Sequence, residues 1–118
     1  MLILACLYWG EGNKNELNII NSDPNLIRIF VNCLKKLGVR NEDLLVSARI
    51  YEDLDPEKVK SFWAKTLDID KKLIRSINVL SSKKKGKLKY GMCRVRVRKG
   101  ARYFKIIMSM IDLIKSNL

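Results

Sequence analysis

The chain has 118 residues, an apolar fraction of 47% and a formal net charge of +12. This length and composition suit one globular domain over residues 1–118 and argue against a disordered chain. Because histidine is absent, a Ser-His-Asp triad, a Cys-His pair and histidine-based zinc sites are excluded. The three cysteines lack CxxC spacing, so we expect neither a disulfide framework nor a zinc knuckle, and we expect a cytoplasmic protein.

The first part of the chain predicts helices that alternate with single strands. An apolar run at the start predicts a short helix that ends at Gly12, a residue suited to the left-handed conformation after a helix. Asp23 and Pro24 open the next helix as cap and first residue, and Gly38 ends it. The expected elements are a helix over 2–11, a strand around 17–19, a helix over 24–37 and an alternating strand over 44–51.

The second part predicts one more helix, two strands and a terminal helix. Asp55 and Pro56 repeat the cap-and-proline opening. Two apolar-alternating segments joined by a lysine-rich turn are typical of a hairpin. The expected elements are a helix over 56–67, strands over 74–80 and 89–99, and a helix over 101–117. The prediction is therefore an α+β fold in which an antiparallel sheet packs against helices, in the order α-β-α-β-α-β-β-α.

The positive charge is concentrated in the second part of the chain. Residues 1–70 carry 9 basic and 11 acidic side chains, whereas residues 71–118 carry 15 basic side chains and Asp112 as their one acid. Such an excess favours a polyanionic partner, for which nucleic acid is the first candidate. The apolar start is too short for a membrane span, and no membrane partner is expected.

Three arginines alternate with apolar residues in the predicted strand over 89–99. The alternation of Cys93, Val95 and Val97 with the arginines indicates a sheet with one buried and one solvated face. An edge strand protected by charge is the alternative interpretation. The residues expected to contact nucleic acid are Arg49, Tyr51, Lys83, Lys84, Lys85, Lys87, Lys89, Arg94, Arg96 and Arg98.

The segment over residues 4–12 combines small side chains, one carboxylate and a glycine. Glu11 falls in the last turn of the predicted helix, where the helix dipole disfavours a negative charge unless a cation lies nearby. A divalent metal ion would supply that cation. Cys6 and Gly10 lie one turn apart and form a small-xxx-small pair, which allows two helices to approach closely.

This segment resembles the signature of the LAGLIDADG homing endonucleases. Leu4, Ala5, Leu7 and Gly12 are identical to the motif, with Gly10 as its small residue and Glu11 as its final acid, while Cys6 and Trp9 depart from it. The resemblance implies a homing-endonuclease-like sheet that lies along DNA, with Glu11 as catalytic and metal-binding acid for Mg²⁺ or Mn²⁺. It also implies a homodimer through the motif helix. The implied interface residues are Leu4, Ala5, Cys6, Trp9 and Gly10.

Three functions follow from these patterns. The leading hypothesis is a LAGLIDADG-like, metal-dependent endonuclease that cuts double-stranded DNA as a homodimer. The alternative is a non-catalytic DNA- or RNA-binding module, a regulator or splicing helper, on the same scaffold. A third hypothesis is a small basic RNA- or ribosome-associated protein unrelated to that family.

Overall fold

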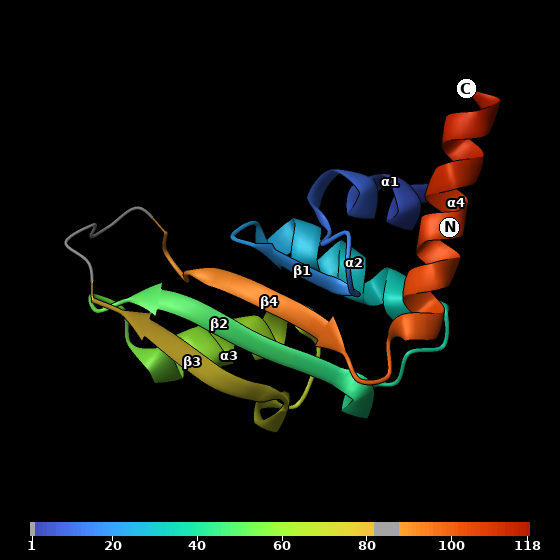
Figure 1. Cartoon of the computed structure of the whole chain (residues 1–118). Coiled ribbons are helices and arrows are strands. Elements are labelled where there is room, and N and C mark those ends of the chain that lie inside the picture. Colours follow the sequence, from blue (N-terminus) through green and yellow to red (C-terminus); the bar gives the residue numbers. More distant parts are fainter. Residues whose placement is uncertain (1, 82–87) are drawn as a thin grey trace.

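The computed structural model describes residues 2–81 and 88–118, and the order of its helices and strands is the predicted one (Figure 1). The helices are α1 (Leu2–Glu11), α2 (Pro24–Lys36), α3 (Pro56–Leu67) and α4 (Ala101–Asn117). The strands are β1 (Asn18–Asn21), β2 (Leu44–Tyr51), β3 (Ile74–Leu80) and β4 (Met92–Val97), and short 3₁₀ turns, Asn41–Asp43 and Lys71–Leu73, precede β2 and β3. The α+β class is confirmed.

The four strands form a mixed sheet in the order β1-β4-β2-β3. β4 lies antiparallel to both β1 and β2, whereas β3 lies parallel to β2. The predicted hairpin between β3 and β4 is therefore wrong, and so is a wholly antiparallel sheet. The α3 crossover lets β3 pair in parallel with β2, and β4 returns to the centre, where both of its edges are paired.

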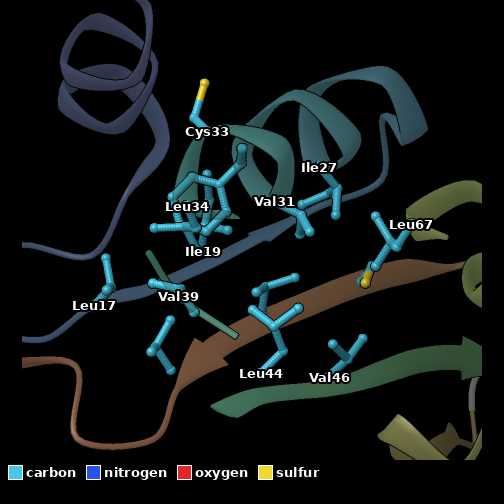
Figure 2. Packing of buried hydrophobic residues seen from close by; sticks show 14 of the residues in the cluster. Leu17, Ile19, Ile27, Val31, Cys33, Leu34, Val39, Leu44, Val46 and Leu67 are labelled. Atoms are coloured by element: carbon cyan, nitrogen blue, oxygen red, sulfur yellow. The ribbon is translucent and has the colours of Figure 1, made fainter. Parts of the chain in front are cut away.

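Helices α2 and α3 lie on one side of the sheet, and the core fills the space between these helices and the sheet (Figures 1 and 2). The side chains of Leu44, Val46, Ala48 and Ile50 on β2 face this core, as the alternation predicts. From β4, Cys93, Val95 and Val97 point the same way. Both central strands thus direct one set of side chains into the core and the other set out of the opposite face.

Local signals explain where the helices begin. The carboxylates of Asp23 and Asp55 accept hydrogen bonds from the amides of Asn25 and Glu57 at 2.9 and 3.0 Å, which confirms both predicted caps. Gly38 ends α2 with φ +106°, a conformation that favours glycine. These turns set the two helices against the sheet.

The start of β4 depends on a glycine. Gly91 has φ +72°, and a Cβ there would clash with the backbone oxygen of Arg49. This close approach brings β4 alongside β2 immediately before the strand begins. The strand is shorter than predicted, since residues 98–100 form a turn.

Candidate nucleic-acid interface

The face of the sheet opposite α2 and α3 is covered by none of the helices that the structure describes (Figure 1). We call it the open face. In the sheet register Arg94 pairs with Ser47 and with Ile20, so side chains from three strands share this face. Its outward residues are Ile20, Leu45, Ser47, Arg49, Tyr51, Ser76, Asn78, Leu80, Met92, Arg94 and Arg96.

The arginines of the open face come from the two central strands. Arg49 lies on β2, and Arg94 and Arg96 lie on β4, two residues or roughly 7 Å apart along the strand. Because β4 is paired on both edges, these arginines do not protect an exposed strand edge. The alternative interpretation from the sequence is therefore wrong.

Arg94 lines a small depression of about 40 Å³ on the open face. Arg49, Ser47 and Asn78 line it as well, so guanidinium, hydroxyl and amide groups converge there. The Nε atom of Arg94 is buried and has no hydrogen-bond partner within residues 2–81 and 88–118. A buried donor without a partner is costly, so a side-chain movement that brings this atom to an outside acceptor would be stabilising.

The other residues predicted to contact nucleic acid do not all lie on the open face. Tyr51 is half-buried on the open face at the end of β2, and Lys89 is exposed, with its ammonium 5.8 Å from the centre of the Tyr90 ring. Lys83, Lys84, Lys85 and Lys87 lie outside the described residues. Arg98 was predicted to lie on the same face as Arg94 and Arg96, but it does not belong to the open face. It lies in the turn after β4, where its amide donates to the carbonyl of Asp43 at 2.7 Å.

Two groups of polar residues were missed by the sequence prediction. Ser76 and Asn78 belong to the open face because β3 pairs in parallel with β2. Their alternation in β3 was the available signal, but the assumed hairpin placed this strand against the wrong neighbour. Lys99 and Arg102 lie beside Arg98 at the end of the sheet, where Arg40 also lies. No sequence pattern links Arg40 to the others.

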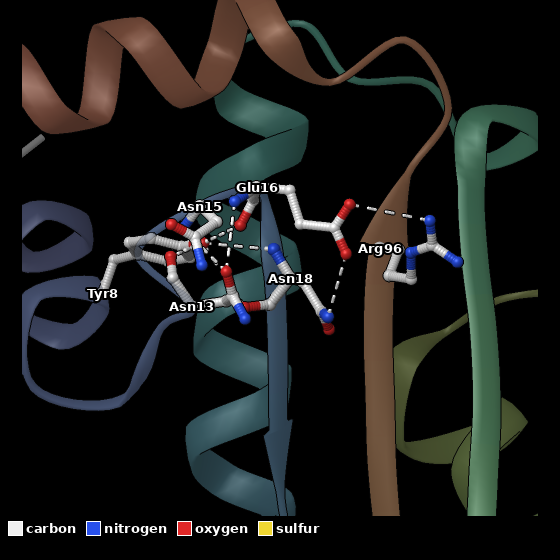
Figure 3. Close-up of polar contacts among 6 residues, drawn as sticks. All are labelled: Tyr8, Asn13, Asn15, Glu16, Asn18 and Arg96. Atoms are coloured by element: carbon white, nitrogen blue, oxygen red, sulfur yellow. Dashed lines mark hydrogen bonds and ion pairs between the residues drawn. The ribbon is translucent and has the colours of Figure 1, made fainter.

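Tyr8 connects α1 to the loop that leads into β1 (Figure 3). Its hydroxyl shares its proton between the carbonyls of Asn13 and Glu16, each 2.6 Å away, and accepts from the amide of Asn18 at 3.1 Å. The Glu16 carboxylate in turn lies 3.8 Å from the guanidinium of Arg96. The buried ring of Tyr8 thereby holds the loop whose acid faces the edge of the open face.

The C-terminus of α1 differs from the predicted one in two ways. Gly12 does not adopt the left-handed conformation; it is required because a Cβ there would clash with the Tyr8 ring. The cation at this helix end is Lys14, whose ammonium donates to the carbonyls of Tyr8 and Gly12 at 3.2 and 2.7 Å. Lys14 thus supplies a positive charge of the kind that the helix dipole favours at this end.

Glu11 is exposed at the end of α1, and its carboxylate accepts a hydrogen bond from the Asn21 amide at 3.2 Å. Mg²⁺ prefers about six oxygen ligands in octahedral geometry. Within the described ranges 2–81 and 88–118, no three Asp, Glu, Cys or His side chains come together that could hold a metal ion. One carboxylate in a single chain therefore does not fit a metal site by itself.

The residues predicted for a dimer interface divide into two sets. Leu4 and Ala5 are fully buried in the core of their own chain, so the prediction that they face a second subunit is wrong. Cys6, Trp9 and Gly10 are exposed, and a Cβ at Gly10 would meet only open space. Packing of α1 on α2 and α4 explains the difference, because the helix already uses one face within the chain.

Removing the Tyr8 hydroxyl is expected to weaken the fold measurably. In Tyr8→Phe the Asn18 amide and two carbonyls lose their shared partner, while the ring keeps its contacts with Phe30 and Phe104. The free energy of unfolding should fall by about 1 to 3 kcal/mol, as measured by urea denaturation. An unchanged value would show that the hydroxyl does not hold the loop.

The same variant tests a pH dependence. Burial raises the pKa of the Tyr8 hydroxyl above its ordinary value of 10.0, with a contribution from Glu16, and the Asn18 hydrogen bond opposes the rise. Above pH 10 the unfolded chain then loses this proton before the folded chain does, so stability falls as pH rises. In alkaline denaturation, the parent should lose more stability between pH 9 and 11 than Tyr8→Phe does.

Among the described residues, none of the helices combines the length and apolar character that crossing a bilayer requires. Comparison with protein-family models, with curated proteins and with solved structures finds no significant match.

Proposed function

We propose that this protein binds nucleic acid through the open face of its sheet. The observation that carries the proposal is the position of Arg94, half-buried at the centre of the face with an unpartnered Nε and with Arg49 and Arg96 beside it. Arginine forks onto guanine edges or onto phosphate oxygens, the acceptors that such a donor lacks. The resemblance of residues 4–12 to LAGLIDADG proteins supports the same proposal.

Double-stranded DNA is the favoured partner. The major groove of DNA exposes base edges to which arginine forks, and the arginines lie on the adjacent central strands β2 and β4. Single-strand binders instead stack bases on several aromatic side chains. Among the described residues Tyr51 is the one aromatic side chain on the open face. Phe62 and Tyr90 stack on each other, with ring centres 3.6 Å apart.

A salt titration with a labelled duplex tests binding. If six to ten cations contact phosphates, affinity should fall by about three to five decades between about 50 and 200 mM salt. Competition with single-stranded DNA and with RNA of the same sequence then ranks the partners. A flat salt response, or the absence of binding at 50 mM salt, would overturn the proposal.

Metal-dependent cleavage is a second candidate function, which the exposure of Glu11 favours. The carboxylate is accessible at the end of α1, and the exposed side chains of Cys6 and Trp9 lie on the same helix. A second chain packed on that surface would bring two Glu11 carboxylates together and supply ligands that one chain lacks. In such a dimer Glu11 would hold Mg²⁺ or Mn²⁺, which activates water in phosphodiester hydrolysis.

A plasmid-nicking assay separates the two candidates. The parent protein should nick DNA with Mg²⁺ or Mn²⁺, and Glu11→Gln should lose this activity by about a hundredfold or more while it retains DNA affinity. Asn21→Ala is a useful companion, because it removes the one described hydrogen-bond donor to Glu11 and keeps the carboxylate. Nicking that persists in Glu11→Gln would exclude Glu11 from catalysis. Tight binding by the parent without nicking would support nucleic-acid binding and contradict cleavage.

A further inference from the structure

A group of exposed cations lies just beyond the end of β4, outside the open face. They come from the turn after β4, from the first turn of α4 and from the segment before β2. We call them the end cluster; its members are Arg40, Arg98, Lys99 and Arg102. Together with Asp43 and Tyr103 they line a depression of about 310 Å³.

The charges of the end cluster are largely uncompensated. Arg40 pairs with Glu42 and Asp43 at 3.4 and 3.5 Å. Arg98, Lys99 and Arg102 form no ion pair with any residue that the structure describes. Four cations around one lining acid repel one another, and a polyanion would relieve that repulsion.

The backbone at Lys99 also disfavours a lysine. Its φ is +53°, in the left-handed region that glycine and asparagine adopt most easily. Lys99 forms no ion pair with a described residue, and its left-handed backbone is less favourable for lysine than for glycine. A side chain that breaks a local rule without a structural gain is a candidate for binding.

The end cluster is continuous with the open face. A depression of about 270 Å³ at the start of α4 is lined by Arg96 and by Lys99. Arg96 therefore borders the open face on one side and this depression on the other. Arg96 thus connects the open face to Lys99 of the end cluster through a depression that Glu16 also lines.

We propose that the end cluster binds the phosphate backbone of the DNA duplex that lies on the open face. This inference rests on the proposed function and adds to it a second, sequence-independent contact beyond the end of β4. Phosphate is the expected ligand because the cluster is exposed and lies beyond the end of β4, whereas base edges are reached from a surface that enters a groove.

The test compares three proteins on a labelled duplex of about 20 base pairs, which exceeds the 46 Å length of the protein. The variant Arg98→Gln/Lys99→Asn/Arg102→Gln removes three charges, and asparagine tolerates the left-handed conformation. The control Lys36→Gln/Lys58→Gln/Lys65→Gln removes the same charge from exposed positions on α2 and α3. Arg40 is retained because its two ion pairs stabilise the turn before β2.

We expect the slope of log affinity against log salt to fall by about 2 to 3 in the end-cluster variant and by less than about 1 in the control. The preference among duplex sequences should stay the same. Circular dichroism verifies that each variant is folded, and Lys99→Asn alone should reduce the slope by about 1 without lowering the unfolding midpoint.

The possible failures are distinguishable. A parent that binds DNA with an end-cluster variant of unchanged slope would overturn this inference and leave the proposed function in place. A parent that binds no DNA would overturn both. A variant that loses sequence preference together with its slope would assign the end cluster to base recognition and contradict the phosphate assignment.

Discussion

Replacing the three arginines of the open face by glutamine is expected to lower duplex affinity at least about a hundredfold. Arg49, Arg94 and Arg96 each present a guanidinium to the same face. Loss of one arginine contact to a base edge costs about 1 to 3 kcal/mol, and 1.4 kcal/mol is a factor of ten in affinity. Fluorescence anisotropy at constant salt measures the change. Glutamine retains part of each side-chain stem, so packing beneath the guanidinium groups is largely kept.

The control for this experiment is the triple variant on α2 and α3 that carries the same loss of charge. Lys36, Lys58 and Lys65 belong to helices on the covered side of the sheet, so their replacement should reduce affinity less than about threefold, through the weaker overall field alone. Equal losses in the two variants would mean that net charge and not the open face governs binding.

Trp63→Ala is expected to have the largest effect on stability. The indole is fully buried, its Nε1 donates to the carbonyl of Tyr90 at 2.9 Å, and its ring meets Phe62 edge-on with centres 5.2 Å apart. Removing it should lower the free energy of unfolding by about 3 to 5 kcal/mol, a large share of the 5 to 15 kcal/mol of a typical domain. Because Tyr90 lies two residues before β4 begins, binding by the arginines of β4 should weaken as well.

Urea denaturation followed by far-ultraviolet circular dichroism measures this loss. Trp9→Ala is the matched control, because Trp9 is 41% exposed and is approached by the Lys115 ammonium at 5.5 Å from its ring centre. Its loss should cost no more than about 1 kcal/mol. If the two variants unfold at the same urea concentration, Trp63 does not anchor β4.

The helices and strands could be predicted because their signals are local. Asp23 with Pro24 and Asp55 with Pro56 specify helix starts through a cap and a fixed φ, and the structure shows both caps. The alternation in β2 specifies which side chains are buried. Each of these signals depends only on residues that are close together in the chain, so it can be recognised in the sequence alone.

Strand neighbours and the surroundings of the motif helix could not be predicted in the same way. The pairing of β3 with β2 runs through the α3 crossover and joins segments that are not neighbours in sequence, so two adjacent strands in sequence do not reveal it. Lys14 lies only three residues from Glu11, yet its role at the helix end depends on the turn that Tyr8 closes. The sequence alone does not show that this lysine side chain folds back onto the end of the helix.

The most direct test of the central claim is a nuclear magnetic resonance titration of ¹⁵N-labelled protein with a DNA duplex. Binding through the open face predicts the largest shifts at outward residues of β2 and β4, above all at the Nε–H resonance of Arg94, whose donor has no partner within the described chain. Amides of α2 and α3 should barely move. Shifts centred on those helices, or an unchanged Arg94 resonance at saturating duplex, would contradict it.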